Sequence, residues 1–362
     1  MTRKEFVKMC GILGIGMAGQ GVLSGYKEGG TQVNKVIIIG AGAGGMSAGY
    51  LLNQLGIEFE LLEASSVYGG RMRIDPDFTD FPIALGSEWI ETDLGIFDEI
   101  VNDNSVQIDF ATIADNPDRK FVNYSWFNFF EDHVVPSISG KIEFNTIVES
   151  INYEADVISV TTQNGIRTAD RVIVAVPLRI LQDGDISFVP DLPQSKRNAI
   201  SSMRVWDGFK AFFEFTDHFY DDMEFTITPE TDGQKLYYDA AFGQNSTKNI
   251  LGLFTVGTPA QDYISRSGDD LRDFILAELD GFYDGQATQK YVKHIIQNWN
   301  AEPFIKCGYM SDYVDYSDVA ILGESIDNKI LFAGGAYTDG NDWVSIHTAA
   351  RSAKVAIDAI TG

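Results

Sequence analysis

The pattern of apolar and polar positions first becomes regular after a glycine-rich N-terminal stretch, where it predicts a β-α-β unit. Residues 35–39 (KVIII) are a short, uninterrupted and mostly β-branched run, which is typical of a strand buried in a parallel sheet. A glycine-rich turn follows at residues 40–45. Residues 46–55 then have the composition of a helix that Gly56 ends, and residues 58–63 form a second strand.

Later segments predict a second group of strands. Residues 157–162 are followed by an Asn-Gly pair, which favours a tight hairpin turn. In residues 209–215 and 236–256, aromatic and polar residues alternate as they do in antiparallel strands. The other predicted elements are a buried strand at 171–177, an amphipathic helix at 269–282, a strand and turn at 330–335, and a closing helix at 347–360.

Composition and charge narrow the class of protein. The chain has 362 residues, 44% of them hydrophobic, which is enough for a sizeable core and favours two interleaved domains. Its formal charge of −25 makes nucleic acid a poor partner, because phosphates must be neutralised by Lys and Arg. Such a surface either attracts cations, protonated amines included, or serves only solubility. We expect no disulfide framework, no metal centre and no membrane span.

The N-terminal segment, residues 1–32, predicts either an export signal or a helix that packs on the rest of the protein. A charged start precedes a modest, glycine-rich apolar stretch. The order Thr-Arg-Lys-x-Phe-Val-Lys resembles the twin-arginine signal, with Lys4 at the position of the second arginine. An export signal would place the protein in the periplasm, whereas a packed helix would leave it in the cytoplasm.

The glycine-rich turn carries the first chemical motif, Gly40-x-Gly42-x-x-Gly45. Gly40 permits the tight turn, Gly42 lets the backbone approach a pyrophosphate, and Gly45 allows the helix to pack closely on the strand. The N-terminus of the helix favours negative charge. Glu63 ends the second strand, where its carboxylate can accept a hydrogen bond from a ribose hydroxyl. Together these features predict a dinucleotide-binding site.

Residues 63–72 (EASSVYGGRM) distinguish between dinucleotides. They resemble the E-A-x-x-x-x-G-G-R signature of the flavin-containing amine oxidase (monoamine oxidase-like) family, in which the arginine, here Arg71, reaches the phosphates of FAD. The resemblance implies an α/β fold: a glutathione-reductase-like, Rossmann-type FAD-binding domain with an interleaved α+β substrate domain. It continues in order through residues 85–90, 142–151, 172–193, 208–215, 299–309 and 332–350.

The resemblance also implies which residues form the site. Lys210 would hold a water at flavin N5; the alternative is a lysine at the end of an edge strand that points to solvent. Tyr309 and Trp343 would form an aromatic wall of the substrate pocket. The residues expected to bind FAD are Gly40, Gly42, Gly44, Gly45, Glu63, Ala64, Gly70, Arg71, Gly86, Ser87, Val148, Gly334, Gly335 and Val344.

The sequence departs from the family pattern near the C-terminus. Gly335 and Ala336 stand where the family often has an acidic residue after Phe-Ala-Gly. Ile346 stands where the monoamine oxidases have a second cage tyrosine, and the candidates to replace it are Trp343, Tyr337 and Tyr124. Cys307 falls one position before the site of covalent flavin attachment, so we expect FAD to be bound non-covalently.

The segment between the first two FAD-binding blocks, residues 86–134, is shorter than in the family, so the substrate cannot be transferred from the resemblance. Its aromatic cluster at residues 126–130 is usually core, but could line an apolar cavity or cover the surface of a homodimer. An amino acid substrate would need an arginine opposite its carboxylate, for which Arg179 and Arg204 are available.

These expectations combine into one reading of domains and function. The FAD-binding domain would comprise residues 33–85, 135–192 and 303–362, and the substrate domain residues 86–134 and 193–302. The expected reaction oxidises a C–N bond of an amine to an imine with hydride transfer to flavin N5, and oxygen or another acceptor reoxidises the flavin. Two alternatives stay open: an FAD oxidoreductase that acts on a reduced nicotinamide or an unsaturated lipid, and a flavin-binding protein without turnover.

Overall fold

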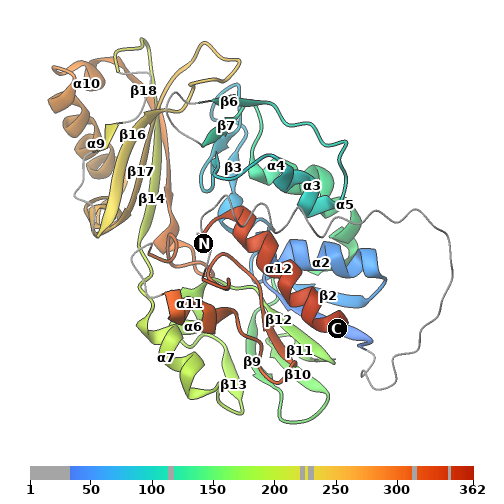
Figure 1. Ribbon diagram of the computed structural model, residues 1–362. Helices are drawn as coiled ribbons and strands as arrows, with labels where there is room; N and C mark the ends of the chain where they lie inside the picture. The colour runs from blue at the N-terminus through green and yellow to red at the C-terminus, as the bar shows by residue number, and fades with distance from the viewer. Residues whose placement is uncertain (1–32, 113–117, 221–224, 227–231, 312–315, 341–343) are drawn as a thin grey trace. The chain divides into compact units, whose positions relative to one another are not determined.

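In the computed structural model, a parallel five-stranded sheet has the strand order β19-β12-β1-β2-β8, and Figure 1 labels two of its strands, β2 and β12. Strands β1, β12 and β19 are almost wholly buried, which explains why their sequences are continuous apolar runs. Residues on alternate sides of β1 enter two different cores. The strands are β1 (Lys35–Ile39), β2 (Glu58–Leu62), β8 (Ile142–Glu143), β12 (Arg171–Val174) and β19 (Ile330–Phe332).

The two faces of this sheet are covered by different elements. Val36 and Ile38 share a core with helices α2 (Ala43–Leu55) and α12 (Ile346–Thr361), which pack against each other. Ile37 and Ile39 share a core with a four-stranded sheet of order β11-β10-β9-β13 and three helices. These elements are β9 (Val148–Asn152), β10 (Ile158–Thr162), β11 (Gly165–Ala169), β13 (Ser187–Val189), α6 (Leu178–Gln182), α7 (Gln194–Ser202) and α11 (Tyr316–Gly323).

A separate antiparallel sheet has the order β15-β16-β17-β14-β18. Strand β14 pairs with β17 on one side and β18 on the other, and all eight of its residues are buried. Its odd-numbered residues, such as Phe209 and Phe213, pack with helix α9, whereas Phe212 packs with residues 78–85 on the opposite face. The elements are β14 (Gly208–Phe215), β15 (Phe225–Thr226), β16 (Gly233–Asp239), β17 (Asn249–Gly257), β18 (Tyr291–Asn298), α9 (Gly268–Phe282) and α10 (Gln286–Lys290).

The segment of residues 86–134 contains a small sheet of order β5-β7-β6 and two helices. Trp126, Phe129 and Phe130 are at most 2% exposed and belong to the core shared with α2, and Trp126 also lines the main cavity. The elements of this segment are β5 (Trp89–Ile90), α3 (Gly95–Val101), β6 (Phe110–Thr112), β7 (Arg119–Phe121) and α4 (Trp126–His133).

The remaining short elements are η1 (Gly70–Met72), β3 (Ile74–Asp75), β4 (Ile83–Ala84), α5 (Val135–Ile138), η2 (Ser139–Lys141), η3 (Thr258–Ala260), α8 (Gln261–Ile264) and η4 (Trp299–Ala301).

The structure describes residues 33–112, 118–220, 225–226, 232–311, 316–340 and 344–362, and these belong to a unit that runs from Val33 to Gly362. The predicted export signal or N-terminal helix and the candidate wall residue Trp343 lie outside the described residues. Within the described ranges, no helix is long and apolar enough to cross a bilayer.

The β-α-β unit is confirmed as β1, α2 and β2, and the predicted hairpin is β10 and β11. The buried strand, the antiparallel strands and the closing helix are β12, then β14, β16 and β17, and α12. Strand β18 and helices α7 and α11 were not predicted. Gly268 begins α9 one residue before the predicted start of the amphipathic helix.

Candidate cofactor and substrate site

A cavity of about 1350 Å³ lies at the carboxyl ends of the parallel strands. Ligand pockets usually measure roughly 300–1,000 Å³, so this cavity has room for a dinucleotide and a small substrate. Ile39, Leu62 and Gly334 line it from the parallel sheet, and Lys210 and Phe254 line it from the antiparallel sheet. The position agrees with the general rule that ligands of open α/β sheets bind at the carboxyl ends of the strands.

The glycine turn is shaped by close backbone approaches. Gly40 has φ +99° and donates its N–H to the Leu62 carbonyl oxygen at 2.8 Å, which ties the turn to β2. A Cβ on Gly45 would lie 1.9 Å from the Gly40 carbonyl oxygen, so only glycine fits there. A Cβ on Gly42 would meet nothing within 4 Å, because Gly42 faces the cavity. The turn therefore leaves free space at the point where a pyrophosphate would approach the N-terminus of α2.

The Glu63 carboxylate is held in place by backbone donors. Its Oε2 accepts from Ala41 N–H at 2.6 Å and its Oε1 accepts from Ser65 N–H at 2.8 Å. A carboxylate has about four acceptor positions, so Glu63 can also accept from a ribose hydroxyl. Val148 is 5% exposed and lines the same cavity, as does Ala64.

Arg71 joins the N-terminal signature to residues near the C-terminus. Its guanidinium donates to the Gly308 carbonyl oxygen, and its own carbonyl oxygen accepts from Ser87 N–H at 3.0 Å. A Cβ on Gly86 would lie 1.7 Å from the Arg71 carbonyl oxygen, so Gly86 is required for this approach. All of the residues expected to bind FAD line the cavity, except Gly45, which packs the turn. The lining members are Gly40, Gly42, Gly44, Glu63, Ala64, Gly70, Arg71, Gly86, Ser87, Val148, Gly334, Gly335 and Val344.

Lys210 is 4% exposed on the interior strand β14, so the solvent-facing alternative for this lysine is wrong. Its side chain points to the cavity face of the antiparallel sheet. The Nζ donates to the carbonyl oxygens of Ala84 at 2.9 Å and Gly86 at 3.0 Å, and to Glu88 Oε2 at 2.7 Å. A water held by Lys210 would have to share or replace one of these acceptors, and the proposed water-binding role stays a prediction.

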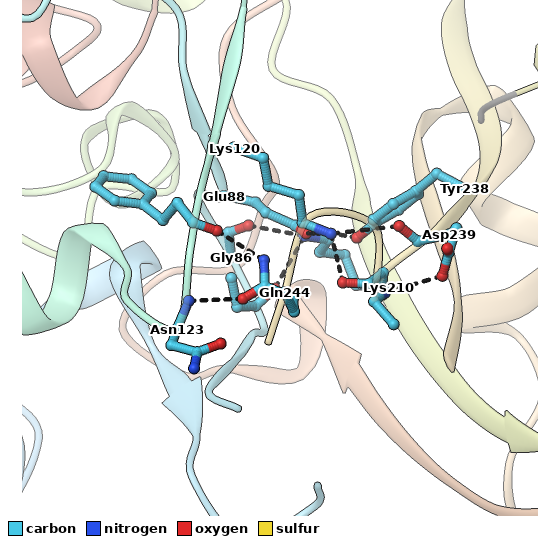
Figure 2. Close-up of polar contacts among 12 residues, drawn as sticks. Gly86, Glu88, Lys120, Asn123, Lys210, Tyr238, Asp239 and Gln244 are labelled. Atoms are coloured by element: carbon cyan, nitrogen blue, oxygen red, sulfur yellow. Dashed lines mark hydrogen bonds and ion pairs between the residues drawn. The ribbon is translucent and has the colours of Figure 1, made fainter. Parts of the chain in front are cut away.

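Glu88 lies at the centre of a buried charged cluster that sequence reasoning missed (Figure 2). Besides the ion pair with Lys210, it accepts from the Tyr238 hydroxyl at 2.5 Å and lies 3.6 Å from Lys120 Nζ. Burial acts to raise the pKa of Glu88, but Lys210 and Lys120 together hold that pKa below its usual value. Burial lowers the pKa of Lys120, and the Glu88 and Asp239 carboxylates oppose this effect.

Of the two residues expected to form the aromatic wall, Tyr309 is found at the cavity and Trp343 lies outside the described residues. Tyr309 lines the cavity, and its ring is in edge contact with Trp206 at 5.7 Å between centroids. Trp299 also lines the cavity and donates its Nε1–H to the Leu85 carbonyl oxygen at 3.1 Å. Tyr337 lines it too, but its hydroxyl donates to the Val176 carbonyl oxygen. Tyr124 is not among the described lining residues and instead donates to Asp132, so it does not replace the missing cage tyrosine.

Three further residues are placed away from the cavity lining. Cys307 is 3% exposed, and it is not among the described lining residues, which fits non-covalent binding of a flavin. Arg179 pairs with Asp183 and Arg204 pairs with Asp232. Neither arginine is among the described lining residues, so neither can face the carboxylate of an amino acid substrate in this arrangement.

The parallel sheet, the glycine turn, Glu63 and a cavity shared with a second sheet define an oxidoreductase of the Rossmann-type flavoprotein class. Residues 38–100 match the NAD(P)-binding Rossmann-like domain family, and residues 132–361 match the flavin-containing amine oxidoreductases. The chain belongs to the flavin-containing amine oxidoreductase family, as its signature at residues 63–72 predicted. FAD is the cofactor that the residues of the cavity fit.

Individual relatives agree with this assignment. Lysine-specific histone demethylase 1B of Mus musculus is 26% identical over 203 residues, which cover 54% of this chain and 25% of that protein. Polyamine oxidase 4 of Oryza sativa subsp. japonica is 27% identical over 223 residues, 60% of this chain and 44% of that protein. The chain thus spans from about a quarter to less than half of these two relatives.

Solved structures have the same fold over almost the whole chain. A triple mutant of putrescine oxidase, redesigned in its cofactor binding, superposes with a TM-score of 0.74 at 14% identity and covers 91% of this chain and 99% of its own. The wild-type putrescine oxidase bound to putrescine gives a TM-score of 0.71, also at 14% identity, with the same coverage. The monoamine oxidase-like fold class is therefore confirmed.

Proposed function

We propose that this protein is an FAD-dependent enzyme that oxidises the C–N bond of a small aliphatic amine to an imine. The observation that carries the proposal is a cavity that joins the dinucleotide-binding turn to Lys210 and to the aromatic side chains of Tyr309 and Trp299. Family membership and relatives that are named polyamine oxidases support this class of substrate. The product imine would then be hydrolysed by water.

The chain's own residues would hold the cofactor along the length of the cavity. The turn at Gly42 and the N-terminus of α2 would bind the pyrophosphate, and Glu63 would bind the ribose. Val148 would contact the adenine, while Gly86 and Gly334 would approach the flavin. FAD, when bound, supplies the acceptor for the hydride equivalent taken from the carbon next to the amine nitrogen.

The lining of the cavity suits a cationic molecule that must become neutral. Trp299, Tyr309 and Phe254 give an apolar surface that disfavours an ammonium group, and only the neutral amine has a lone pair to assist oxidation. The described lining residues nevertheless include six acidic side chains and three cations of Lys and Arg, so the field attracts amines. The six are Glu63, Glu88, Glu91, Asp118, Asp185 and Glu302, and the three are Arg71, Arg73 and Lys210.

An anaerobic titration tests the proposal directly. The oxidised flavin band of the purified protein is followed while primary amines, secondary amines, diamines and polyamines are added one by one. We expect one class of aliphatic amine to bleach the band at a low concentration. A band that survives every amine but is bleached by a reduced nicotinamide would instead identify a related oxidoreductase with a different substrate.

The electron acceptor is tested on the same sample. Air is admitted after the amine has bleached the flavin, and hydrogen peroxide is measured as the band returns. Peroxide formed in proportion to the amine added is expected if oxygen is the acceptor. Slow return of the band without peroxide would indicate a dehydrogenase with another acceptor.

A further inference from the structure

The charged cluster behind the cavity contains a lysine, Lys120, that the proposed oxidation of an amine does not use. Lys120 is 3% exposed, and it lies beside Glu88 without being among the described residues that line the main cavity. Lys210 and Glu88 both line that cavity. The ion pair of Glu88 and Lys210 carries no net charge by itself, and Lys120 adds a second positive charge to it.

The surroundings of Lys120 are those of an ammonium ion. Its Nζ donates to the carbonyl oxygens of Ala240 and of Asp239, the latter at 3.3 Å, and lies 3.6 Å from Glu88 Oε1. It also lies 5.8 Å from the ring centroids of both Trp89 and Tyr238, within the range of cation–π attraction. These acceptors and ring faces favour the charged form of Lys120, whereas burial and the nearby Lys210 cation lower its pKa.

The strand that carries Lys120, β7, is fixed by polar contacts to the turn between β16 and β17 (Figure 2). Gln244 donates its Nε2–H to the Phe121 carbonyl oxygen at 2.7 Å, and its Oε1 accepts from Asn123 N–H at 2.7 Å. The Asp239 carboxylate accepts from Ala241 N–H at 3.0 Å and lies 4.0 Å from His218; it is not among the described lining residues. Glu88 is therefore the carboxylate that Lys120 shares with Lys210.

We propose that Lys120 is a positioning residue that offsets the charge of Glu88, so that Lys210 acts on the cofactor cavity as an uncancelled cation. The inference rests on the proposed binding of FAD in this cavity. A positive charge beside a flavin favours the reduced form, which carries more negative charge, and so raises the reduction potential. The charge of Lys120 thereby makes the bound flavin a stronger oxidant of amines.

The test measures the two-electron midpoint potential of the bound flavin by equilibration with a reference dye, without any amine. Lys120→Met leaves a balanced Glu88–Lys210 pair, so the protein should fold. We expect its potential to fall by about 30 mV, which is tenfold in the equilibrium constant for two electrons. One unit charge acting over roughly 10 Å at an effective dielectric constant of about 20 gives an effect of this order.

A double variant separates charge from structure. Lys120→Met combined with Glu88→Gln removes one positive and one negative charge, so the potential should return close to that of the wild type. Damage to packing would lower the potential further or leave it low. The matched control is Lys196→Met, because Lys196 is also buried and donates to two carbonyl oxygens, but is not among the described lining residues.

The outcomes distinguish this inference from the proposed function. An unchanged potential in Lys120→Met, or a double variant as low as the single one, would overturn the role of Lys120 while leaving amine oxidation intact. A wild-type protein that shows no flavin band would instead remove the proposed function and this inference with it. A shift of equal size in Lys196→Met would show that any lost lysine has this effect.

Discussion

The glycine turn lines the cavity, and the charged wall of Glu88, Lys120 and Lys210 lies at and behind another side of it, yet the two are built in opposite ways. The turn comes from one continuous β-α-β unit and depends on glycines, because a Cβ on Gly45 would meet a backbone oxygen. The wall brings together Glu88, Lys120 and Lys210 from three distant segments and depends on ion pairing in a buried place. The turn should therefore be intolerant of added volume, whereas the wall should be intolerant of losing the carboxylate that its two lysines share.

Removal of the Glu88 carboxylate should have the largest effect on the stability of the protein. Glu88→Leu leaves Lys120 and Lys210 buried without their shared carboxylate, and we expect a loss of about 3–5 kcal/mol in the free energy of unfolding. Glu99→Leu is the control, because Glu99 pairs with Arg351 at the surface and should cost about 0–1 kcal/mol. Denaturant titration of both variants measures the difference, and equal losses would show that charge balance does not hold the wall together.

Addition of one methyl group at Gly45 or at Gly42 tests whether close packing determines the conformation of the glycine turn. We expect Gly45→Ala to cost about 3 kcal/mol and to abolish retention of FAD, because the new Cβ would lie 1.9 Å from the Gly40 carbonyl oxygen. Gly42→Ala adds the same methyl group where nothing lies within 4 Å, so the unfolding free energy without FAD should stay close to that of the wild type. Thermal unfolding and the ratio of flavin to protein give both readouts. If the two variants behaved alike, the close packing at Gly45 would not be what sets this turn.

The same contrast explains what the sequence could and could not predict. Residues 35–63 contain the strand, the turn, the helix and the acid in one stretch, so local periodicity and glycine spacing were enough to find them. Lys210 was found through the family resemblance, but its contacts were not, because they come from residues 84–88 and depend on how two sheets meet. Lys120 stands in a short strand with no motif, so a single sequence has no signal for its burial.

A smaller effect is expected from a buried lysine away from the cavity lining. Lys196 on α7 donates to the carbonyl oxygens of Leu322 at 2.9 Å and Glu324 at 2.6 Å, near the end of α11, and its Nζ lies 4.0 Å from the Phe332 ring centroid. Lys196→Met should destabilise the protein by about 1–3 kcal/mol, because two buried carbonyl groups lose their hydrogen-bond donor. Equilibrium unfolding measures this. If the variant lost its flavin but kept its stability, Lys196 would belong to the cofactor site instead.

The smallest effect on stability is expected from Tyr237 and Tyr238 of the antiparallel sheet, and it appears only at alkaline pH. Tyr238 donates to Glu88 in the wall, and Tyr237 donates to Glu278 at 2.6 Å on the α9 side. Burial, with the neighbouring carboxylates, raises the pKa of both phenols well above the usual value. Above pH 10 the unfolded chain loses phenol protons that the folded protein keeps, so stability should fall as pH rises, by about 1.4 kcal/mol per pH unit for each tyrosine.

Phenylalanine at either position should remove its share of that slope, and the pair of variants compares the two faces of one sheet. Tyr238→Phe and Tyr237→Phe should each flatten the fall in stability between pH 10 and pH 11 by the same amount, as measured by urea unfolding at several pH values. Only Tyr238→Phe removes a donor to Glu88. Tyr237→Phe could flatten the curve while Tyr238→Phe does not. That result would mean that water reaches the wall at high pH. Ion pairing, and not exclusion of water, would then be what keeps Glu88, Lys120 and Lys210 together.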